Sequence, residues 1–307
     1  MIENDAALLQ LLKVLRRSDY EFITPTPDTH RLVWRRPMPR RGLREVFGWS
    51  RTFGPGDLAP EVLTLMEAGG VLERRGRRYA SRVRVSTVHG RLFLHSAFPP
   101  KQQDAVFLGP DTYRFADFIR RELAGVTGVR TLVDIGTGAG VGAVIAAGCC
   151  PDAEVIATDI NDRAIQLARI NAAHAGVQMD CVETSALDAV GGPLDLVVAN
   201  PPYIATSSGR TYRDGGDMLG TRLSFDWAQA AAQRLSPGGR LLLYTGSAIV
   251  NGEDRFRAAL AEMLDGEGCD LRYGELDPDI FSSQLKHPAY FGVERIAAIG
   301  AVAVKRA

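Results

Sequence analysis

The sequence predicts an α/β protein, with a Rossmann-like, mostly parallel sheet preceded by a smaller α+β domain. Three features lead to this prediction. From about residue 101, apolar strand-like segments alternate with helical ones, and a glycine-rich turn at 136–140 directly follows the first of those strands. Before Pro99-Pro100 the chain has a different pattern and a different charge. We therefore predict two domains, over 1–100 and 101–307.

The first hundred residues predict helices and a hairpin. Residues 5–17 have apolar positions at helical spacing and a basic end, which is typical of a helix. Residues 25–42 are rich in Pro and Arg and are expected to be irregular. Asp57 is a candidate N-cap for a helix over 58–67. A hairpin over 71–85 follows, and this order of helix, helix and hairpin is similar in pattern to a winged helix.

Charge is distributed unevenly between the two domains. Residues 1–100 carry 17 Lys and Arg against 10 Asp and Glu, whereas the rest of the chain carries 19 against 26. The asymmetry indicates an anionic partner for the N-terminal domain, with docking on the acidic half or exposure to solvent as alternatives. The expected hairpin tip holds Arg74, Arg75, Arg77 and Arg78, which would suit phosphates or an acidic protein surface equally.

Composition argues against several other classes of protein. No run of about 18 apolar residues indicates a membrane span, and the N-terminus lacks the order of a secretory signal, so we expect a cytoplasmic protein. The four cysteines show no CxxC spacing. They are therefore expected to be free thiols, and no metal site is predicted. Composition leaves the oligomeric state open.

The second domain is predicted to alternate strands with helices. The expected strands span 129–135, 154–159, 179–183, 194–199 and 240–244, and the expected helices span 139–147, 162–175, 222–235 and 253–264. Segments 271–276 and 295–304 are expected to close the sheet as a final hairpin. Ligands of parallel sheets bind at the carboxyl ends of the strands, so the residues that follow each strand are the candidates for a site.

The first of these strand ends is rich in glycine. Leu132–Ile135 runs into Gly136-Thr137-Gly138-Ala139-Gly140. A strand, a glycine-rich turn and a helix together let a ligand approach the backbone and the helix N-terminus closely. Position 141 is Val, where the dinucleotide fingerprint has its third glycine, and no Gly-Lys-Ser/Thr follows. The spacing therefore predicts neither a dinucleotide site nor a Walker loop.

The second strand ends at an acid, Asp159, 23 residues after Gly136. A carboxylate there can accept both ribose hydroxyls of a nucleoside and would repel a 2′-phosphate. Capping the following helix is the alternative role, but Asn161 can do that. We therefore expect Asp159 to bind a ligand.

The fourth strand ends in Asn200-Pro201-Pro202-Tyr203. The two prolines fix φ and donate no backbone hydrogen bonds, so their carbonyl oxygens act only as acceptors. Asn200 adds a side-chain acceptor at the same edge of the sheet. Two converging acceptors can hold an –NH2 group, and Tyr203 offers a ring on which a planar group can stack.

The glycine turn and its acid resemble the class I S-adenosylmethionine-dependent methyltransferases. That resemblance implies a seven-stranded mixed sheet with an antiparallel last strand, and S-adenosylmethionine as the cofactor of residues 101–307. It also implies the cofactor contacts. Gly136, Thr137, Gly138 and Gly140 would lie under the methionine moiety, Asp134 near its amino group, Asp159 at the ribose, and Ile160, Ser185 and Ala186 at the adenine.

Asn-Pro-Pro-Tyr resembles the motif of amino-methylating enzymes, which include the N6-adenine methyltransferases and the HemK-type glutamine N5-methyltransferases of release factors. By that resemblance Asn200, Pro201 and Tyr203 act at the reacting nitrogen, Pro202 contacts the substrate, and Asn200 also borders the cofactor. Residues 106–112 resemble the HemK-type Pro-Arg-x-x-Thr-Glu element, which implies that Thr112 contacts the cofactor. The arginine of that element is missing, and Tyr113 stands where its Glu is expected.

Two later segments are candidates for substrate binding. The glycine-rich loop over 205–220 follows the motif directly and suits a gating segment, with Tyr212, Arg213 and Asp214 as the expected contacts. Residues 287–290 lie between the last two expected strands, an edge that often faces substrate in this fold.

Together these residues predict an S-adenosylmethionine-dependent methyltransferase. The expected acceptor is an amide or exocyclic amino nitrogen of a macromolecule, either a protein glutamine or a nucleic-acid base, with the 1–100 domain docking that partner. Catalysis would hold the nitrogen lone pair in line with the methyl group, while Asn200 and the Pro201 carbonyl stabilise its hydrogens.

Two other functions remain open from the sequence. One is a small-molecule N-methyltransferase, and the other is a nucleic-acid-binding regulator that senses the cofactor. The intact Asn-Pro-Pro-Tyr motif argues against the regulator, because sensing needs no clamp for an amino group.

Overall fold

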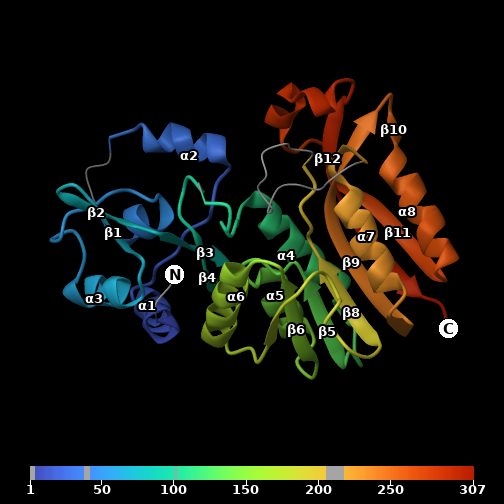
Figure 1. The fold of residues 1–307 in the computed structure, drawn as a ribbon, viewed down its shortest axis with the longest axis horizontal. Coiled ribbons are helices and arrows are strands. Elements are labelled where there is room, and N and C mark those ends of the chain that lie inside the picture. Colours follow the sequence, from blue (N-terminus) through green and yellow to red (C-terminus); the bar gives the residue numbers. More distant parts are fainter. Residues whose placement is uncertain (1–3, 38–41, 101, 205–217) are drawn as a thin grey trace.

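The computed structural model describes residues 4–37, 42–100, 102–204 and 218–307. A smaller N-terminal part lies beside a larger part that is built on one central sheet (Figure 1). Three of the predicted substrate contacts, Tyr212, Arg213 and Asp214, lie outside the described residues. Within the described part of the chain, no helix is long and apolar enough to cross a membrane.

The central sheet confirms the predicted fold class. Its strands follow the order β11-β12-β9-β8-β5-β6-β7, and β10 pairs with β9. Strands β5 to β9 pair in parallel along this path, whereas β12 runs antiparallel between β9 and β11. The strands are β5 (Thr131–Ile135), β6 (Glu154–Asp159), β7 (Asp180–Glu183), β8 (Leu194–Ala199), β9 (Leu235–Val250), β10 (Glu253–Asp254), β11 (Cys269–Asp277) and β12 (Arg295–Lys305).

Helices cover both faces of this sheet (Figure 1). Adjacent residues of β5 show the division: Leu132 packs into the cluster of α4 (Pro110–Glu122), α5 (Val141–Cys149) and α6 (Asp162–Ala175). Its neighbour Val133 packs with α7 (Arg222–Ala232) and α8 (Arg255–Gly266). Because successive side chains of a strand point to opposite faces, a sheet buried on both sides needs the continuous apolar runs seen here.

The N-terminal part combines helices with two hairpins. Its helices are α1 (Asp5–Arg17), α2 (Pro27–Trp34) and α3 (Pro60–Ala68), with one π-helical turn, η1 (Arg44–Gly48). Strands β1 (Leu72–Arg75) and β2 (Arg78–Ser81) form the predicted arginine-tipped hairpin, and β3 (Val83–Val88) and β4 (Arg91–Ser96) form a second one. The N-terminal part meets the larger part mainly where α1 and β4 pack against α6.

Two local expectations for the N-terminal part are wrong. Residues 27–34 form helix α2, because Thr26 caps it by accepting the Thr29 N–H at 3.2 Å and Pro27 is preorganised for the first turn. Asp57 does not cap α3, which begins at Pro60 after Ala59. Its carboxylate instead closes the preceding turn by accepting the Gly54 N–H at 2.6 Å.

The remaining elements of the described residues are short 3-10 turns, η2 (Met218–Gly220), η3 (Ser282–Lys286) and η4 (Pro288–Tyr290). The last two lie between β11 and β12, next to the carboxyl ends of the parallel strands (Figure 1).

Candidate active site

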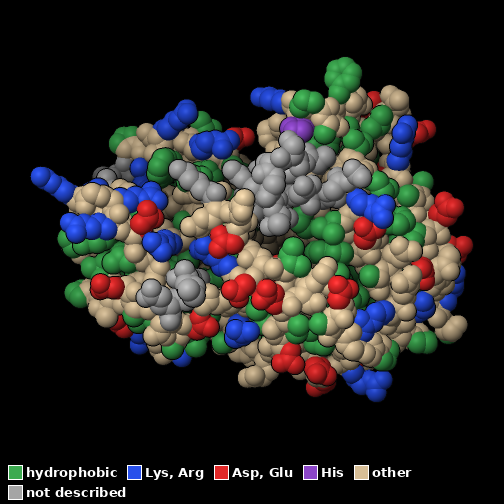
Figure 2. Space-filling view, viewed as in Figure 1, with side chains coloured by type: hydrophobic (Ala, Val, Ile, Leu, Met, Phe, Trp, Pro, Cys, Tyr) green, Lys and Arg blue, Asp and Glu red, His purple; other side chains and the backbone are tan. Residues whose placement is uncertain are grey.

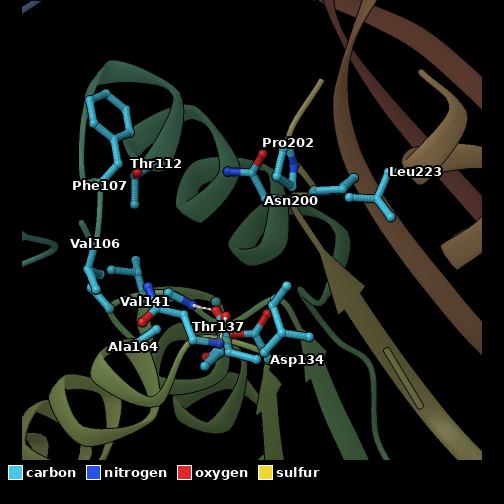
Figure 3. Close-up of a pocket in the computed structure, with 18 of the residues that line it drawn as sticks. Val106, Phe107, Thr112, Asp134, Thr137, Val141, Ala164, Asn200, Pro202 and Leu223 are labelled. Atoms are coloured by element: carbon cyan, nitrogen blue, oxygen red, sulfur yellow. Dashed lines mark hydrogen bonds between the residues drawn. The ribbon is translucent and has the colours of Figure 1, made fainter. Parts of the chain in front are cut away.

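A cavity of about 250 Å³ lies at the carboxyl ends of the parallel strands (Figure 3). It collects the segments that follow β5, β6, β7 and β8, together with the first turns of α4. Thirteen predicted site residues line it: Thr112, Asp134, Gly136, Thr137, Gly138, Asp159, Ile160, Ser185, Ala186, Asn200, Pro201, Pro202 and Tyr203. Four strand ends far apart in sequence therefore converge on one space.

The glycine turn owes its form to positive φ angles and close packing. Gly136, Gly138 and Gly140 have φ of 66°, 55° and 80°. A Cβ on Gly136 would lie 2.4 Å from the Trp227 ring, so only glycine lets that ring approach. Gly140 caps α5 and packs against Ala168 of α6, away from the cavity. The structure thus places Gly140 behind the turn, not among the residues that line the cavity.

Asp134 is a buried acid beneath this turn. One of its oxygens, Oδ2, accepts the Thr137 hydroxyl at 2.6 Å and the Ala143 N–H at 2.8 Å. Burial raises the pKa of Asp134 to about 7, because the charged form is taken out of water. Figure 3 shows the side chain at the floor of the cavity. A cationic ligand group in the cavity would favour its ionised form.

Asp159 stands at the end of β6 with both oxygens held by backbone groups. Oδ2 accepts the Gly138 N–H at 3.0 Å, and Oδ1 accepts the Asn161 N–H at 2.9 Å. Asn161 caps α6 by accepting the Arg163 N–H, as expected. Burial raises the pKa of Asp159. Each carboxylate oxygen has a further lone pair, so both can still accept a ligand hydroxyl.

An apolar edge lies beside Asp159. Ile160 is 60% exposed, an unusual state for a large aliphatic side chain, and it borders the cavity. Ser185 and Ala186 border it from the segment after β7, where Ala186 adopts a φ of 42° and its carbonyl accepts the Thr158 hydroxyl. The Ile160 side chain at this edge can pack against an apolar or planar ligand group.

The Asn-Pro-Pro-Tyr turn closes the other side of the cavity. Figure 3 shows the Asn200 side chain projecting into the cavity from the end of β8. Its amide makes no hydrogen bond to any residue within the described ranges. Tyr203 also borders the cavity, but it is only 8% exposed, since its ring packs edge-on against Tyr244 and beside Phe281.

The segment that precedes the sheet enters the cavity from α4. This helix begins at Pro110, and Thr112 accepts the Gly109 N–H within its first turn. Tyr113 does not line the cavity. Its hydroxyl accepts the Thr24 N–H at 2.9 Å and so joins α4 to the N-terminal part. Burial raises the pKa of Tyr113.

The lining also includes residues that the sequence did not predict, among them Asp111, Trp227 and Phe281. Phe281 lies in the segment between β11 and β12, close to the predicted 287–290, with a left-handed backbone at φ 56°. The 287–290 segment itself does not border the cavity. Asp111 could have been predicted as a site residue because it is an acid next to Thr112, whereas nothing in the sequence singles out Trp227 or Phe281.

The chemical character of the described lining suits a cation. It includes three carboxylates, from Asp111, Asp134 and Asp159, and no Lys or Arg among the described residues. A diphosphate would meet no cationic side chain among the lining residues that the structure describes. S-adenosylmethionine, with a sulfonium and an ammonium group, fits this donor set.

The arginine tip of the β1–β2 hairpin lies away from the cavity, at the far end of the N-terminal part (Figure 1). Arg75 pairs with Glu73 at 3.1 Å, and Arg78 pairs with Asp57 at 3.4 Å. The cysteines are free, and Cys150 and Cys269 are buried. Among the described residues, no cluster of His, Cys, Asp or Glu has the arrangement of a metal site.

The known proteins to which this chain is similar are methyltransferases. Residues 120–253 match the methyltransferase small domain family. The release factor glutamine methyltransferase of Deinococcus radiodurans is 33% identical over 215 residues, which cover 66% of this chain and 75% of that protein. The enzyme of the same name from Bradyrhizobium diazoefficiens is 30% identical over 225 residues, covering 67% and 74%.

Solved structures show the same fold at low identity. A transferase structure from Pyrococcus horikoshii matches with a TM-score of 0.52 at 13% identity, over 80% of this chain and 83% of that one. The tRNA m1G37 methyltransferase of M. jannaschii matches with a TM-score of 0.50 at 13% identity, over 77% and 63%. The chain belongs to the HemK-like family of class I S-adenosylmethionine-dependent methyltransferases, and it is an enzyme that methylates nitrogen.

Proposed function

We propose that this protein methylates the side-chain amide nitrogen of a glutamine in a peptide-chain release factor. One observation carries the proposal: the Asn-Pro-Pro-Tyr turn faces the glycine turn and Asp159 across a single cavity. The similarity to release factor glutamine methyltransferases supports the choice of a protein glutamine over other planar nitrogens.

S-adenosylmethionine supplies the electrophilic methyl group when bound. Gly136–Gly138 would cradle its methionine part, the carboxylate of Asp134 would balance its ammonium, and Asp159 would accept its ribose hydroxyls. Ile160, Ser185, Ala186 and Thr112 would border the remainder. These roles agree with a lining that combines carboxylates with apolar side chains such as the exposed Ile160.

The protein would act on the substrate amide by holding its nitrogen in a fixed orientation. Asn200 Oδ1 and the Pro201 carbonyl would accept the two N–H groups, so that the nitrogen lone pair points at the methyl group. As positive charge builds on nitrogen, the same two acceptors stabilise its hydrogens more strongly than in the ground state. Pro202 and Tyr203 would shape the slot for the planar amide.

The test is methyl transfer from labelled S-adenosylmethionine to a purified bacterial release factor. Label should appear in the release factor, resist ribonuclease and disappear when the acceptor glutamine is replaced by alanine. Label that instead enters ribosomal or transfer RNA and is removed by ribonuclease would contradict the proposal.

Nucleic-acid methylation is a second candidate, because residues 1–100 carry the basic excess described above. Those residues would then dock phosphates near a flipped base. In the release factor assignment the same residues dock an acidic surface of the protein partner. The ribonuclease arm of the assay separates the two.

A further inference from the structure

Asp111 is a buried carboxylate at the cavity to which the reaction outlined above gives no role. It lies in the first turn of α4 and is 6% exposed. Burial raises its pKa, and the hydroxyl of Tyr244 and the nearby Arg114 act in the opposite direction. A buried acid is costly unless its oxygens are well satisfied, so its partners indicate what it does.

Two of those partners come from other parts of the chain, and the third, Arg114, lies on the same helix. The Tyr244 hydroxyl on β9 donates to Asp111 Oδ1 at 3.0 Å. The Tyr203 hydroxyl, from the Asn-Pro-Pro-Tyr turn, lies close enough to the same carboxylate to lower its pKa. Arg114 Nη1 lies 3.5 Å from Asp111 Oδ1, while its Nη2 donates to Asp277 at the end of β11 at 2.6 Å. The carboxylate of Asp111 therefore lies between α4, β9 and the turn that follows β8, and Arg114 extends these contacts to β11.

The ring of Tyr203 is fixed by packing as well. Its centroid lies 6.4 Å from the ring of Tyr244 and 5.9 Å from that of Phe281. Gly246 on β9 leaves the room for it, since a Cβ there would lie 2.5 Å from the Tyr203 ring. The ring is thus confined at its sides, and the Asp111 carboxylate lies near its hydroxyl end. A tyrosine restrained at both places fixes the short turn that carries it.

We propose that Asp111 is a positioning residue for methyl transfer: by holding the Tyr203 hydroxyl it fixes the Asn200–Tyr203 turn in the geometry that presents the amide nitrogen. This inference rests on the proposed function. Asp111 acts through Tyr203 and contacts neither the methyl group nor the ribose. It therefore affects the rate of transfer, whereas cofactor affinity depends on Asp134 and Asp159.

The test is a double-mutant cycle on Asp111→Asn and Tyr203→Phe, with Asp117→Asn as the matched control. Asp117 lies on the same helix, but it is exposed and pairs with His89. Asp111→Asn should lower kcat about tenfold, the lower end of the effect of losing one hydrogen bond to a charged group. Calorimetric affinity for S-adenosylmethionine should change less than about twofold, and the control should match wild type in both.

Coupling decides whether Asp111 acts through Tyr203. Tyr203→Phe should lower kcat to a similar extent, and adding Asp111→Asn to it should change kcat less than about twofold further. Asp111→Glu, which keeps a carboxylate, should retain more of the wild-type rate than Asp111→Asn does. Independent, multiplying effects of the two substitutions would overturn the proposal, as would a normal kcat in Asp111→Asn or a parallel loss of cofactor affinity.

A second readout needs no turnover. Wild type, Asp111→Asn, Tyr203→Phe and the double variant are compared by urea unfolding. A direct contact between Asp111 and Tyr203 requires that the shifts in the unfolding midpoint are not additive. Additive midpoints would overturn the contact itself. If wild type fails to methylate any release factor, the proposed substrate is wrong, and the unfolding cycle still decides whether Asp111 holds Tyr203.

Discussion

Asn171 on α6 binds the backbone of Leu94 on β4 as a neighbouring strand would. Its Oδ1 accepts the Leu94 N–H at 2.8 Å, and its Nδ2 donates to the Leu94 carbonyl at 2.9 Å. The same Nδ2 donates to the carbonyl of Ala139, inside the glycine turn, at 2.9 Å. One fully buried side chain therefore ties the N-terminal part to the turn that borders the cavity.

Replacing Asn171 should affect both stability and cofactor binding. Asn171→Leu leaves three buried backbone groups unsatisfied and should lower the free energy of unfolding by about 3–5 kcal/mol. Asn171→Asp keeps the acceptor for Leu94 but turns a buried carboxylate oxygen towards the Leu94 and Ala139 carbonyls, so it should cost at least as much. Urea unfolding gives the stability, and calorimetry on the folded variants should show weaker S-adenosylmethionine binding. Full stability in Asn171→Leu would show that the two parts are held together elsewhere.

Asn200 is the residue on which the proposed chemistry depends most. Asn200→Ala should reduce turnover by about 10²–10³-fold, the scale for losing one preorganised polar group at a reacting centre. Asn200→Leu keeps the bulk without an acceptor and should be nearly inactive, whereas Asn200→Asp keeps an acceptor and should retain part of the rate. Single-turnover rates with the release factor provide the measurement. An Asn200→Leu protein that binds cofactor and methylates normally would make the turn merely structural.

Asp159 should control cofactor affinity. Asp159→Ala removes two expected ribose hydrogen bonds to a charged acceptor, each contributing about 1.5–3 kcal/mol at most. The Gly138 and Asn161 N–H groups also lose their partner in this variant, so Asp159→Asn, which keeps one acceptor oxygen, is the matched comparison. Calorimetry should rank wild type above Asn and Asn above Ala, and NAD should not bind. Equal affinities in all three proteins would contradict the ribose assignment.

Asp134 should make cofactor affinity depend on pH. In the free protein its pKa is raised to about 7, so the carboxyl is largely protonated below that pH and cannot balance an ammonium group. Affinity for S-adenosylmethionine should therefore rise as pH increases towards 7, by at most about tenfold per unit, and level off above it. Asp134→Asn should flatten this profile in calorimetry between pH 5.5 and 7.5. A profile unchanged by that substitution would assign the proton to another group.

The hairpin arginines should influence docking and leave the chemistry intact. Replacing Arg74, Arg75, Arg77 and Arg78 by alanine should weaken binding of an anionic partner and reduce its dependence on salt. Arg75 and Arg78 already pair with Glu73 and Asp57, so most of the effect should come from Arg74 and Arg77. Titrations at low and high salt test this, with turnover on a short glutamine peptide as the control. Salt-insensitive binding by the wild-type protein would exclude electrostatic docking.

The effect of Tyr203→Phe shows what the structure adds to a sequence motif. From the sequence, Tyr203 is a ring that could stack on a planar group, and loss of its hydroxyl should be mild. In the structure Tyr203 is buried, its hydroxyl lies near the Asp111 carboxylate, and we infer that the two are hydrogen-bonded. Loss of that hydroxyl should therefore lower the rate measurably.

The α/β class, the strand ends and the residues that follow them can all be predicted from the residue pattern alone. Strand and helix periodicity are local properties, and Asp159 and Asn200 are recognisable because ligands of parallel sheets bind where strands end. The helix Pro27–Trp34 also depends on a local signal, the Thr26 cap followed by Pro27, which is masked by the Pro- and Arg-rich composition of 25–42.

The contacts between side chains across the cavity could not be predicted without the folded structure. Asp111 and Tyr244 are 133 residues apart, and Asn171 and Leu94 are 77 apart. No periodicity records such pairs, because they depend on the order of strands in the sheet and on how α4 and α6 lie over it. Burial then changes the chemistry of these groups. It raises the pKa of Asp134. It also makes the hydrogen bonds to Asp111 more important for stability, because a buried charge without partners has no water to stabilise it.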